Sequence, residues 1–440
     1  MNNRRFITLF FLASVLTIFA QNKPEQWDLI SCINYAKENN IQIQKSKISL
    51  EQNSENTKLA QSQFLPSLSA SVGQNYTNRP FLQENSLYDK NTYNGNYGVN
   101  ASMTLFSGGK LMKNLQQQKI YEEMSQYAVL EAEKNIEISI LQIYMQILYA
   151  QEAVNVYKEV IEASQYQRDR GEALLSAGMI SRVDLAQLEA QLSSDKYQLI
   201  GAQNTLQYAK LQLKQLLELT INDDINIVIP EINEENILKP LPDLYNVYFT
   251  SLEVMPQMQS SRLNVDAAEL EIAKARAGYF PRLSLSASAG SSNISGSGLT
   301  FGEQLKYNFN DGVGLSLNIP IFSNRENKTA VQKAKLSEQT AKLDYQDTQK
   351  SLLQEVELAH QDAVSSQSQY VAATENVKAL EISYGMIQQQ YELGMKNTLE
   401  LLTEKNNLLT AQQSQLQAKY TSIMNSQILN LYQDLPIEIK

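Results

Sequence analysis

Several residue types are scarce in this chain of 440 residues, and each scarcity excludes a class of protein. A single cysteine excludes an intramolecular disulfide. Ten prolines and 17 glycines leave few places for turns, so we expect mostly long helices. The formal net charge of -10 comes without any stripe of Lys and Arg residues, and we therefore predict no nucleic-acid partner.

Catalytic motifs are also missing from the sequence. The one histidine, His360, has no cysteines or acids around it at metal-ligand spacing. There is no phosphate-binding loop and no arrangement of Ser, His and Asp that is typical of a nucleophilic enzyme. We predict that the protein is not an enzyme and that it holds no metal or other cofactor.

Long hydrophobic runs are confined to the start of the chain. Residues 1–20 have the form of a secretory signal peptide, in which Arg4 and Arg5 precede an apolar stretch. No later segment approaches 18 consecutive apolar residues, so no transmembrane helix is predicted. The segment from Leu29 to Cys32 superficially resembles a lipoprotein cleavage box. It lies beyond the apolar stretch, and we predict that Cys32 is a buried helix residue.

The chain contains one pattern twice, 216 positions apart. Gly178 and Gly394 each end a helical pattern, and each is followed by a methionine, Met179 or Met395. In both copies an N-cap residue with an acid three positions later opens the next helix; these pairs are Ser181 with Asp184 and Asn397 with Glu400. We therefore predict two tight helix–helix reversals in an internally duplicated chain.

Between the helices of each half, the hydrophobic period changes from 3.6 to 2. The change follows Pro66 in the first half and Pro281 in the second, because proline cannot continue a helix. The segments that follow alternate apolar residues with Ser, Asn and Gly, which predicts two-faced β-strands. Each half is thus expected to contain helix, two strands, a very long helix and a shorter helix.

The predicted elements divide the chain into two repeats and a linker. The first repeat, residues 21–219, has a helix over 27–63, strands over 66–77 and 93–106, a long helix over 108–175 and a helix over 182–219. A linker over 220–242 follows, and residues 433–440 form a C-terminal tail. The second repeat, residues 243–432, has a helix over 243–278, strands over 282–290 and 307–321, a long helix over 323–393 and a helix over 397–432. The shorter helices should stack end to end beside the long one, in a rod about 100 Å long.

The two-faced strands leave three hypotheses open. Four strands cannot close a membrane barrel, which needs about eight, but two or three subunits would supply eight or twelve. Apolar residues would then face lipid and polar residues a water-filled lumen. The second hypothesis is a secreted structural coiled-coil protein whose strands pack as small sandwich caps. The third is a periplasmic adaptor, which also has long helical hairpins.

Several segments of the chain recur in one known family; they are WDLISCINYAKENNI from Trp27, the repeated FLP and YFP before a Ser-rich strand, FSGG from Phe106, and IPIFS from Ile319. With these segments and the two reversals, the chain resembles the TolC family of outer-membrane efflux channels along essentially its whole mature length. The resemblance implies a mainly α-helical homotrimer. Its long-helix hairpins would form a periplasmic α-barrel, continued by a 12-stranded outer-membrane β-barrel with four strands per subunit.

The resemblance also implies a function and partners. The implied function is an exit duct of a tripartite efflux or type I secretion system, which conducts substrates passively across the periplasm and the outer membrane. The implied location is the outer membrane, with a periplasmic helical extension. The implied partners are outer-membrane lipid, a periplasmic adaptor and an inner-membrane pump.

A closed periplasmic mouth at the two reversals is implied as well. Asp184, Tyr391 and Lys396 fall on the aspartate, tyrosine and arginine that tie the family's mouth shut, and Glu400 falls on its first acidic ring, which favours cations. Thr403 falls where a second acidic ring would be, so this ring is expected to be missing. Helix capping alone would also favour Asp184 and Glu400. The implied adaptor contacts are the helix tips, Gly178, Met179, Gly394 and Met395.

Overall fold

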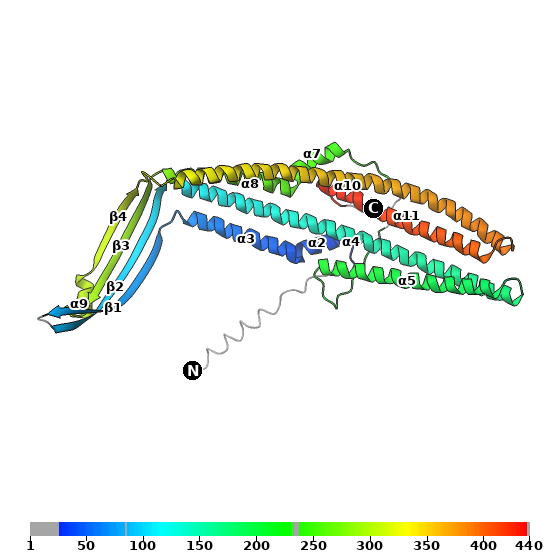
Figure 1. The fold of residues 1–440 in the computed structure, drawn as a ribbon, viewed down its shortest axis with the longest axis horizontal. Coiled ribbons are helices and arrows are strands. Elements are labelled where there is room, and N and C mark those ends of the chain that lie inside the picture. Colours follow the sequence, from blue (N-terminus) through cyan, green and yellow to red (C-terminus); the bar gives the residue numbers. More distant parts are fainter. Residues whose placement is uncertain (1–25, 84–85, 231, 233–236, 438–440) are drawn as a thin grey trace, which may run out of the picture.

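The computed structural model describes residues 26–83, 86–230, 232 and 237–437. The molecule is elongated, with a four-stranded sheet at one end and a long bundle of helices at the other (Figure 1). The predicted signal peptide and the last three residues of the chain lie outside the described residues. Within the described part, no helix is both long and apolar enough to cross a membrane.

Both halves of the chain follow one order of elements. The first half contains α2 (Leu29–Asn39), α3 (Ile41–Ser62), β1 (Ser67–Gln83), β2 (Ser86–Ser107), α4 (Lys110–Ser176) and α5 (Arg182–Leu216). The second half contains α7 (Leu244–Val254), α8 (Pro256–Arg276), the 3-10 helix η1 (Ala277–Tyr279), β3 (Arg282–Ile294), α9 (Phe301–Tyr307), β4 (Asn310–Asn318), α10 (Glu326–Glu392) and α11 (Thr398–Tyr432).

Left-handed backbone conformations recur at the spacing of 216 positions that the sequence predicts. Gly178 has φ 73° and Gly394 has φ 74°, and they follow the ends of α4 and α10. Further pairs with positive φ share this spacing; they are Gly108 with Asn324, Gly109 with Arg325, and Glu218 with Asp434. The backbone is therefore duplicated as well as the sequence pattern. Where the residue is not glycine, the surrounding structure must hold the strained conformation.

Two helices that were expected to be continuous are each broken once. The predicted helix 27–63 is split at Asn40, whose side chain caps α3 by accepting hydrogen bonds from two of its N–H groups. The predicted helix 243–278 is split at Met255, because Pro256 begins α8 and disfavours helical angles in the residue before it. The prediction of an unbroken helix was wrong in both halves.

The strands differ from their predicted bounds at the end distant from the helices. The polar loop expected between 77 and 93 is replaced by a continuation of β1 to Gln83 and of β2 from Ser86, in unbroken antiparallel register. The predicted strand 282–290 likewise continues, to Ile294. The predicted strand 307–321 begins later, at Asn310, because a capping box starts the short helix α9 in the preceding segment.

The four strands form one antiparallel sheet in the order β1-β2-β3-β4. The pairing of β2 with β3 joins the two repeats, with Ala101 opposite Ala287. A bulge between Thr104 and Phe106 interrupts this register near the helical end of the sheet. Strands β1 and β4 are its two edges. In the described protomer, each edge strand has a neighbour on one side only, so its outer backbone groups are open to another chain.

Each long helix is covered by the shorter helices of its own half. Helices α3 and α5 lie one after the other along α4, and α8 and α11 lie one after the other along α10 (Figure 1). The end-to-end arrangement expected from the helix lengths is therefore present. Helix α4 also packs against α8 and α11, which belong to the second half. These contacts join the two halves into one bundle.

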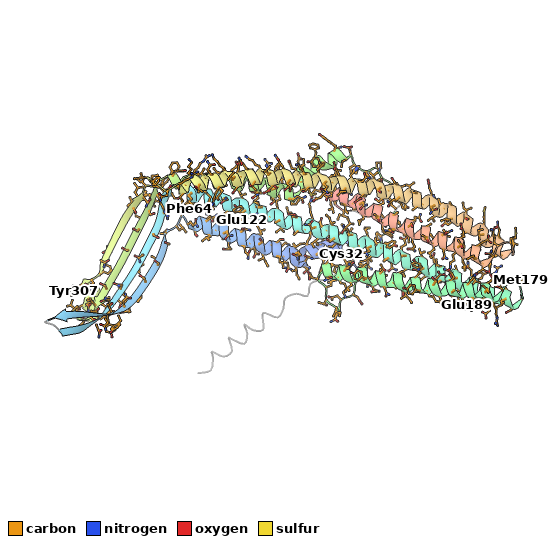
Figure 2. All side chains as sticks on the ribbon, viewed as in Figure 1. Cys32, Phe64, Glu122, Met179, Glu189 and Tyr307 are labelled. Carbon is orange, nitrogen blue, oxygen red and sulfur yellow. The ribbon has the colours of Figure 1, made fainter. Side chains whose placement is uncertain are left out.

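The larger of the two apolar cores found among the described residues lies in the middle of the helical part, where the linker packs against the first half. Trp27 is 2% exposed and forms an isolated bridge with Ile227 of the linker. Tyr144 of α4 is buried in the same core and donates a hydrogen bond to the Val228 carbonyl at 2.6 Å. Cys32, which Figure 2 labels on α2, is fully buried, and this confirms the sequence prediction. Burial raises the pKa of its thiol to about 12.

Candidate functional site

Two helix reversals form the end of the molecule that is farthest from the sheet, and Met179 marks this end in Figure 2. The N–H groups of Gly178 and Met179 donate to carbonyl groups of the last turn of α4, both at 2.9 Å. Those of Gly394 and Met395 do the same at the end of α10, at 3.0 and 2.8 Å. These bonds close each helix end. The Met179 and Met395 side chains remain 73% and 70% exposed, so both tips present apolar surface.

The predicted capping boxes open the two helices that return from the tips. The Ser181 hydroxyl accepts from the Asp184 N–H at 3.2 Å, and the Asp184 carboxylate accepts from the Ser181 N–H at 3.0 Å. Asn397 and Glu400 make the same exchange at 2.9 and 3.1 Å. Hydrogen bonds from Ser181 lower the pKa of Asp184, and the hydrogen bond from the Lys396 ammonium lowers the pKa of Glu400. Both acids are therefore carboxylates at neutral pH.

The predicted mouth residues surround the tips, but within one protomer they do not form the predicted network. Lys396 Nζ lies 2.5 Å from Glu400 Oε1, one turn along the same segment. The Tyr391 hydroxyl is buried without a hydrogen-bond partner among the described residues. Asp184 is bonded by its own capping residue. The network of Asp184, Tyr391 and Lys396 therefore stays a prediction about the assembled mouth.

Polar contacts other than the predicted ones tie the first hairpin to the second. Arg170 of α4 forms a salt bridge with Glu392 of α10, with Nη1 3.1 Å from Oε1. Gln167 of α4 donates to the Tyr384 hydroxyl of α10 at 2.9 Å. Both contacts lie in the last turns before the tips, so the two reversals are held side by side within a single subunit.

A buried ion pair joins the same two hairpins deeper in the bundle, and sequence reasoning missed it. Lys405 of α11 and Asp195 of α5 are 5% and 1% exposed, and Lys405 Nζ lies 2.7 Å from Asp195 Oδ2. The Ser164 hydroxyl of α4 donates to Asp195 and accepts from Lys405. Gln191 donates to the other carboxylate oxygen at 2.8 Å. Each charge is thus paired and hydrogen-bonded, as burial requires.

The sequence did carry a signal for this ion pair. Asp195 follows Leu192 by three residues, and Lys405 follows Leu402 by three residues, so both charges fall on the apolar seam of their helix. A single charge at a seam position of each helix, with opposite sign, predicts pairing once the two helices are known to pack. The packing of α5 against α11 was not part of the sequence prediction.

The sheet is the second candidate site, because its two faces differ. One face carries hydroxyl, amide and glycine positions, such as Ser284, Ser286 and Ser288 on β3. The other face carries apolar side chains that are between 66% and 78% exposed in the protomer; these are Leu68, Val72, Val313 and Leu315. A contiguous apolar face of this kind is typical of a strand that faces lipid. The polar face is then suited to line water.

Comparison with known proteins agrees with this two-part architecture. A sequence profile of the family described as outer membrane efflux protein matches residues 32–218 and 247–432, one range in each half of the chain. The chain is 26% identical to the alkaline protease secretion protein AprF of Pseudomonas aeruginosa over 292 residues, which are 64% of this chain and 58% of AprF. It is 23% identical to the outer membrane protein TolC of Escherichia coli over 408 residues, which are 90% of this chain and 80% of TolC.

The fold is also that of a solved structure. A crystal structure of CusC, from a study of its folding and transmembrane channel formation, superposes with a TM-score of 0.80 at 19% identity. The superposition covers 94% of this chain and 92% of the CusC chain. The repeated helical hairpins, the two-faced sheet and the profile match in both halves lead to one conclusion. The chain belongs to the outer membrane efflux protein family.

Proposed function

We propose that this chain is one subunit of an outer-membrane exit duct in a tripartite efflux or type I secretion system. The duct conducts substrates passively across the periplasm and the outer membrane, and an inner-membrane pump supplies the driving force. One observation carries the proposal: a sheet with an apolar face, a polar face and two open edges continues directly into long helical hairpins. In lipid the open edges must find partner strands, because unpaired backbone groups are too costly there.

Three copies of the chain would close this barrel. In a sheet of four antiparallel strands, β1 and β4 run in opposite directions, so β1 of one copy would pair with β4 of the next without breaking the antiparallel pattern. An eight-stranded barrel would be filled by its own side chains, whereas twelve strands leave room for water. The small residues of the polar face would line that lumen.

The helix tips would receive a periplasmic adaptor. The tip residues are Gly178, Met179, Gly394 and Met395, and both methionines are largely exposed. The two tips of a subunit have the same backbone geometry, so one type of adaptor surface would fit both. A flexible, apolar methionine suits a contact that forms when a pump assembles and dissociates when it disassembles.

The same end would hold the gate. Asp184, Tyr391 and Lys396 would bond across the mouth in the closed trimer, and Glu400 would favour cations in the pore. Two observations support this: the Tyr391 hydroxyl has no partner in the described protomer, and Lys396 and Glu400 form an exposed pair that neighbouring groups can reach. Lysine makes a weaker planar contact than arginine, so this gate should open more easily than one built on arginine.

The mass of the detergent-extracted protein is the first test. Light scattering with the detergent mass subtracted is expected to give three times the protomer mass. A monomer, or a protein that stays in solution without detergent, would contradict the shared barrel.

Conductance in planar lipid bilayers tests the gate. The combined variant Asp184→Ala/Tyr391→Phe is expected to conduct better than the wild type, because it removes two groups that hold the mouth shut. Asp169→Ala is a matched control, since Asp169 is an exposed carboxylate on α4 near the same tip. If the double variant conducts like the wild type, Asp184 serves as a helix cap and the gate lies elsewhere.

A further inference from the structure

A charged residue, Arg282, lies on the polar face of the sheet at the end next to the helices. Side chains on this face come from alternate positions of each strand, and nearly all of the described ones are Ser, Thr, Asn or Gly. Over residues 67–78, 91–107, 282–294 and 310–318 of the sheet, the exceptions on this face are Ile294 at the outer end and Arg282 at the end next to the helices. Within these ranges Arg282 is the only residue of the face that carries a charge.

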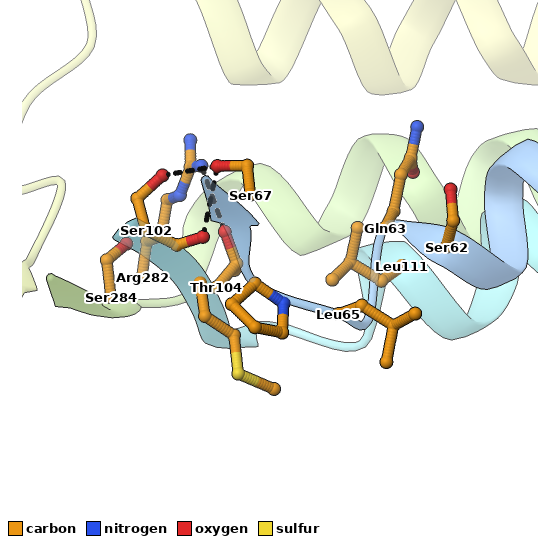
Figure 3. A pocket seen from close by; sticks show the side chains of 11 residues that line it. Ser62, Gln63, Leu65, Ser67, Ser102, Thr104, Leu111, Arg282 and Ser284 are labelled. Carbon is orange, nitrogen blue, oxygen red and sulfur yellow. Dashed lines mark hydrogen bonds between the residues drawn. The ribbon is translucent and has the colours of Figure 1, made fainter. Parts of the chain in front are cut away.

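Arg282 borders a hollow of about 630 Å³ at the joint between the sheet and the helices (Figure 3). The hydroxyls of Ser67 and Ser102 line the same hollow and lie 2.8 Å apart. Thr104 and Ser284 add two more hydroxyls to its wall. Hydroxyl groups can donate hydrogen bonds to an anion without neutralising a neighbouring positive charge.

The Arg282 guanidinium is positioned but not neutralised. Its Nη2 donates to Thr104 Oγ1 at 3.2 Å, and among the described residues no carboxylate pairs with it. A guanidinium presents several N–H donors in a planar fork that matches phosphate and carboxylate groups. One hydrogen bond to a neutral hydroxyl therefore leaves both the charge and most of the donors available.

A second positive charge lies at the same joint. A neighbouring hollow of about 400 Å³ is lined by Arg282 and Thr104 together with Lys110 and Asn318. No Asp or Glu lines either hollow in the described part of the chain. The lining of these two hollows thus carries positive and no negative charge, although the chain as a whole has a net charge of -10.

We propose that Arg282, with the hydroxyls of Ser67, Ser102 and Thr104, is a binding subsite for anionic groups of solutes that pass through the duct. The groups that fit are phosphate, sulfate and carboxylate. The proposal rests on the proposed function, because it requires the polar face to line a water-filled lumen. In a trimer the subsite would occur three times at one level, and a ring of arginines is the arrangement that attracts anions in other pores.

The subsite would act together with the acidic residues at the other end of the tunnel. Glu400 at the mouth favours cations, whereas Arg282 at the start of the barrel favours anions. A low-dielectric wall strengthens the field of each ring at its own level, and salt screens the two from one another over the length of the bundle. An anionic solute would therefore be drawn onward once it has passed the mouth.

Bilayer recordings with the full-length protein test the subsite, with inorganic phosphate as the probe. Phosphate is expected to reduce the wild-type chloride current in a concentration-dependent way. Arg282→Gln should raise the half-blocking concentration by about ten-fold or more, because it removes a charge-assisted hydrogen bond. It should also shift the reversal potential in a salt gradient toward cation selectivity. Arg282→Lys keeps the charge but not the fork, so it should preserve the selectivity and weaken the phosphate block.

A matched variant and a second measurement separate the possible failures. Lys306→Gln removes one positive charge from α9, at the far end of the sheet, and should leave the phosphate block unchanged. Phosphate binding to the purified protein, followed by calorimetry, reports on the subsite without any channel. If the wild type conducts and Arg282→Gln behaves like it in both measurements, the subsite is wrong and the duct stands.

Two further outcomes are decisive. If the wild type forms no channel yet binds phosphate in an Arg282-dependent way, the proposed duct is contradicted. Anion binding at Arg282 is then supported, but its assignment to passing solutes is not. A lipid headgroup is another source of phosphate. Phosphorus that copurifies with the detergent-extracted wild type, and is lost in Arg282→Gln, would overturn the assignment of the site to passing solutes.

Discussion

At the scale of single residues, the charges of Asp195 and Lys405 show how a buried ion pair is held by polar partners. The Asp195–Lys405 pair is almost fully buried and is held by Ser164 and Gln191, whereas the Lys58–Glu55 pair lies in solvent. Because the first pair is buried, the stability of the folded protein depends on both of its members. A lone charge in the interior would have no water to stabilise it. The stability of the folded protein depends little on the exposed pair, since water can stabilise either charge alone.

Removing one member of the buried pair should therefore destabilise the protein. Asp195→Leu leaves the Lys405 ammonium without its counter-charge, and we expect a loss of about 3–5 kcal/mol in the free energy of unfolding. The double variant Asp195→Leu/Lys405→Leu should lose much less, since no charge remains buried. Denaturant unfolding of the detergent-extracted protein measures both. Equal losses in the single and double variants would show that the pair is not coupled, and Lys58→Met, which alters an exposed pair, should change nothing measurable.

Glu131, unlike the Asp195–Lys405 pair, has surroundings that disfavour its charged form. Burial raises the pKa of its carboxyl, and the charge of Glu355 raises it further. The folded state therefore binds the proton of the Glu131 carboxyl more tightly than the unfolded state does. The stability that this proton contributes is complete below the unfolded pKa and is lost as the pH rises through the folded pKa.

A neutral side chain at position 131 should remove the loss of stability that accompanies ionisation of Glu131. We expect Glu131→Gln to raise the midpoint of thermal unfolding at pH 7 and to leave it unchanged at pH 4, where the wild-type carboxyl is itself largely protonated. Circular dichroism of the detergent-extracted protein at the two pH values checks this. Glu123→Gln is the control, because Glu123 is exposed on the same helix. A gain at pH 4 as large as that at pH 7 would exclude the electrostatic explanation.

At the scale of elements, the helix ends decide the shape of each repeat. The two glycine reversals turn the chain back on itself, and Asn40 and Pro256 each break a helix at matching places in the two halves. The first kind of end needs a left-handed residue, and the second needs only a residue that caps or starts a helix.

Two glycines of the second half test the requirement for a left-handed residue, because one has a left-handed backbone and the other is helical. Gly394 has φ 74°, so Gly394→Ala should destabilise the reversal by about 1–2 kcal/mol, the cost of a left-handed alanine. Gly385 lies inside α10 with open space around its Cα, so Gly385→Ala should stabilise the helix by about 0.5–1 kcal/mol. Unfolding curves of the two variants are expected to move in opposite directions. A shift of both in the same direction would contradict the left-handed requirement at Gly394.

At the scale of the whole molecule, the single chain exposes groups that a stable protein normally pairs or buries. Its sheet has two open edges and an exposed apolar face, while its helical part has its own cores. An edge of this kind promotes uncontrolled association unless another strand covers it. In the proposed trimer, assembly would therefore complete the sheet more than it would stabilise the helices.

Engineered cysteines should detect the closure of the barrel. In a Cys32→Ala background, a cysteine at Leu68 on β1 is combined in turn with one at Val313, Leu315 or Leu317 on β4. If β1 of one subunit pairs with β4 of the next, oxidation should link at least one combination into covalent trimers on denaturing gels. The Leu68 cysteine alone is the control and should give no trimer. Monomers in every combination would contradict the β1–β4 closure.

The sequence by itself determined the features that depend on neighbours along the chain. The duplication, both reversals, the capping boxes and the two faces of the strands follow from spacing, N-cap residues and alternation, and the structure has each of them. The helix breaks at Asn40 and Pro256 and the start of α9 had local signals as well. The apolar pattern of the sequence continues across these positions, and it masks the local signals that end one element and begin the next.

The tertiary structure alone decided which distant residues meet. Asn40 donates to the Leu216 carbonyl at the end of α5, and Asp195 meets Lys405 across two repeats. Arg282 reaches Thr104 and a hollow formed by three separate segments. Periodicity states which face of a helix or strand is buried, but it does not state which other face covers it. That choice is made by the packing of all the elements together, because the free energy of burial depends on the fit of both surfaces.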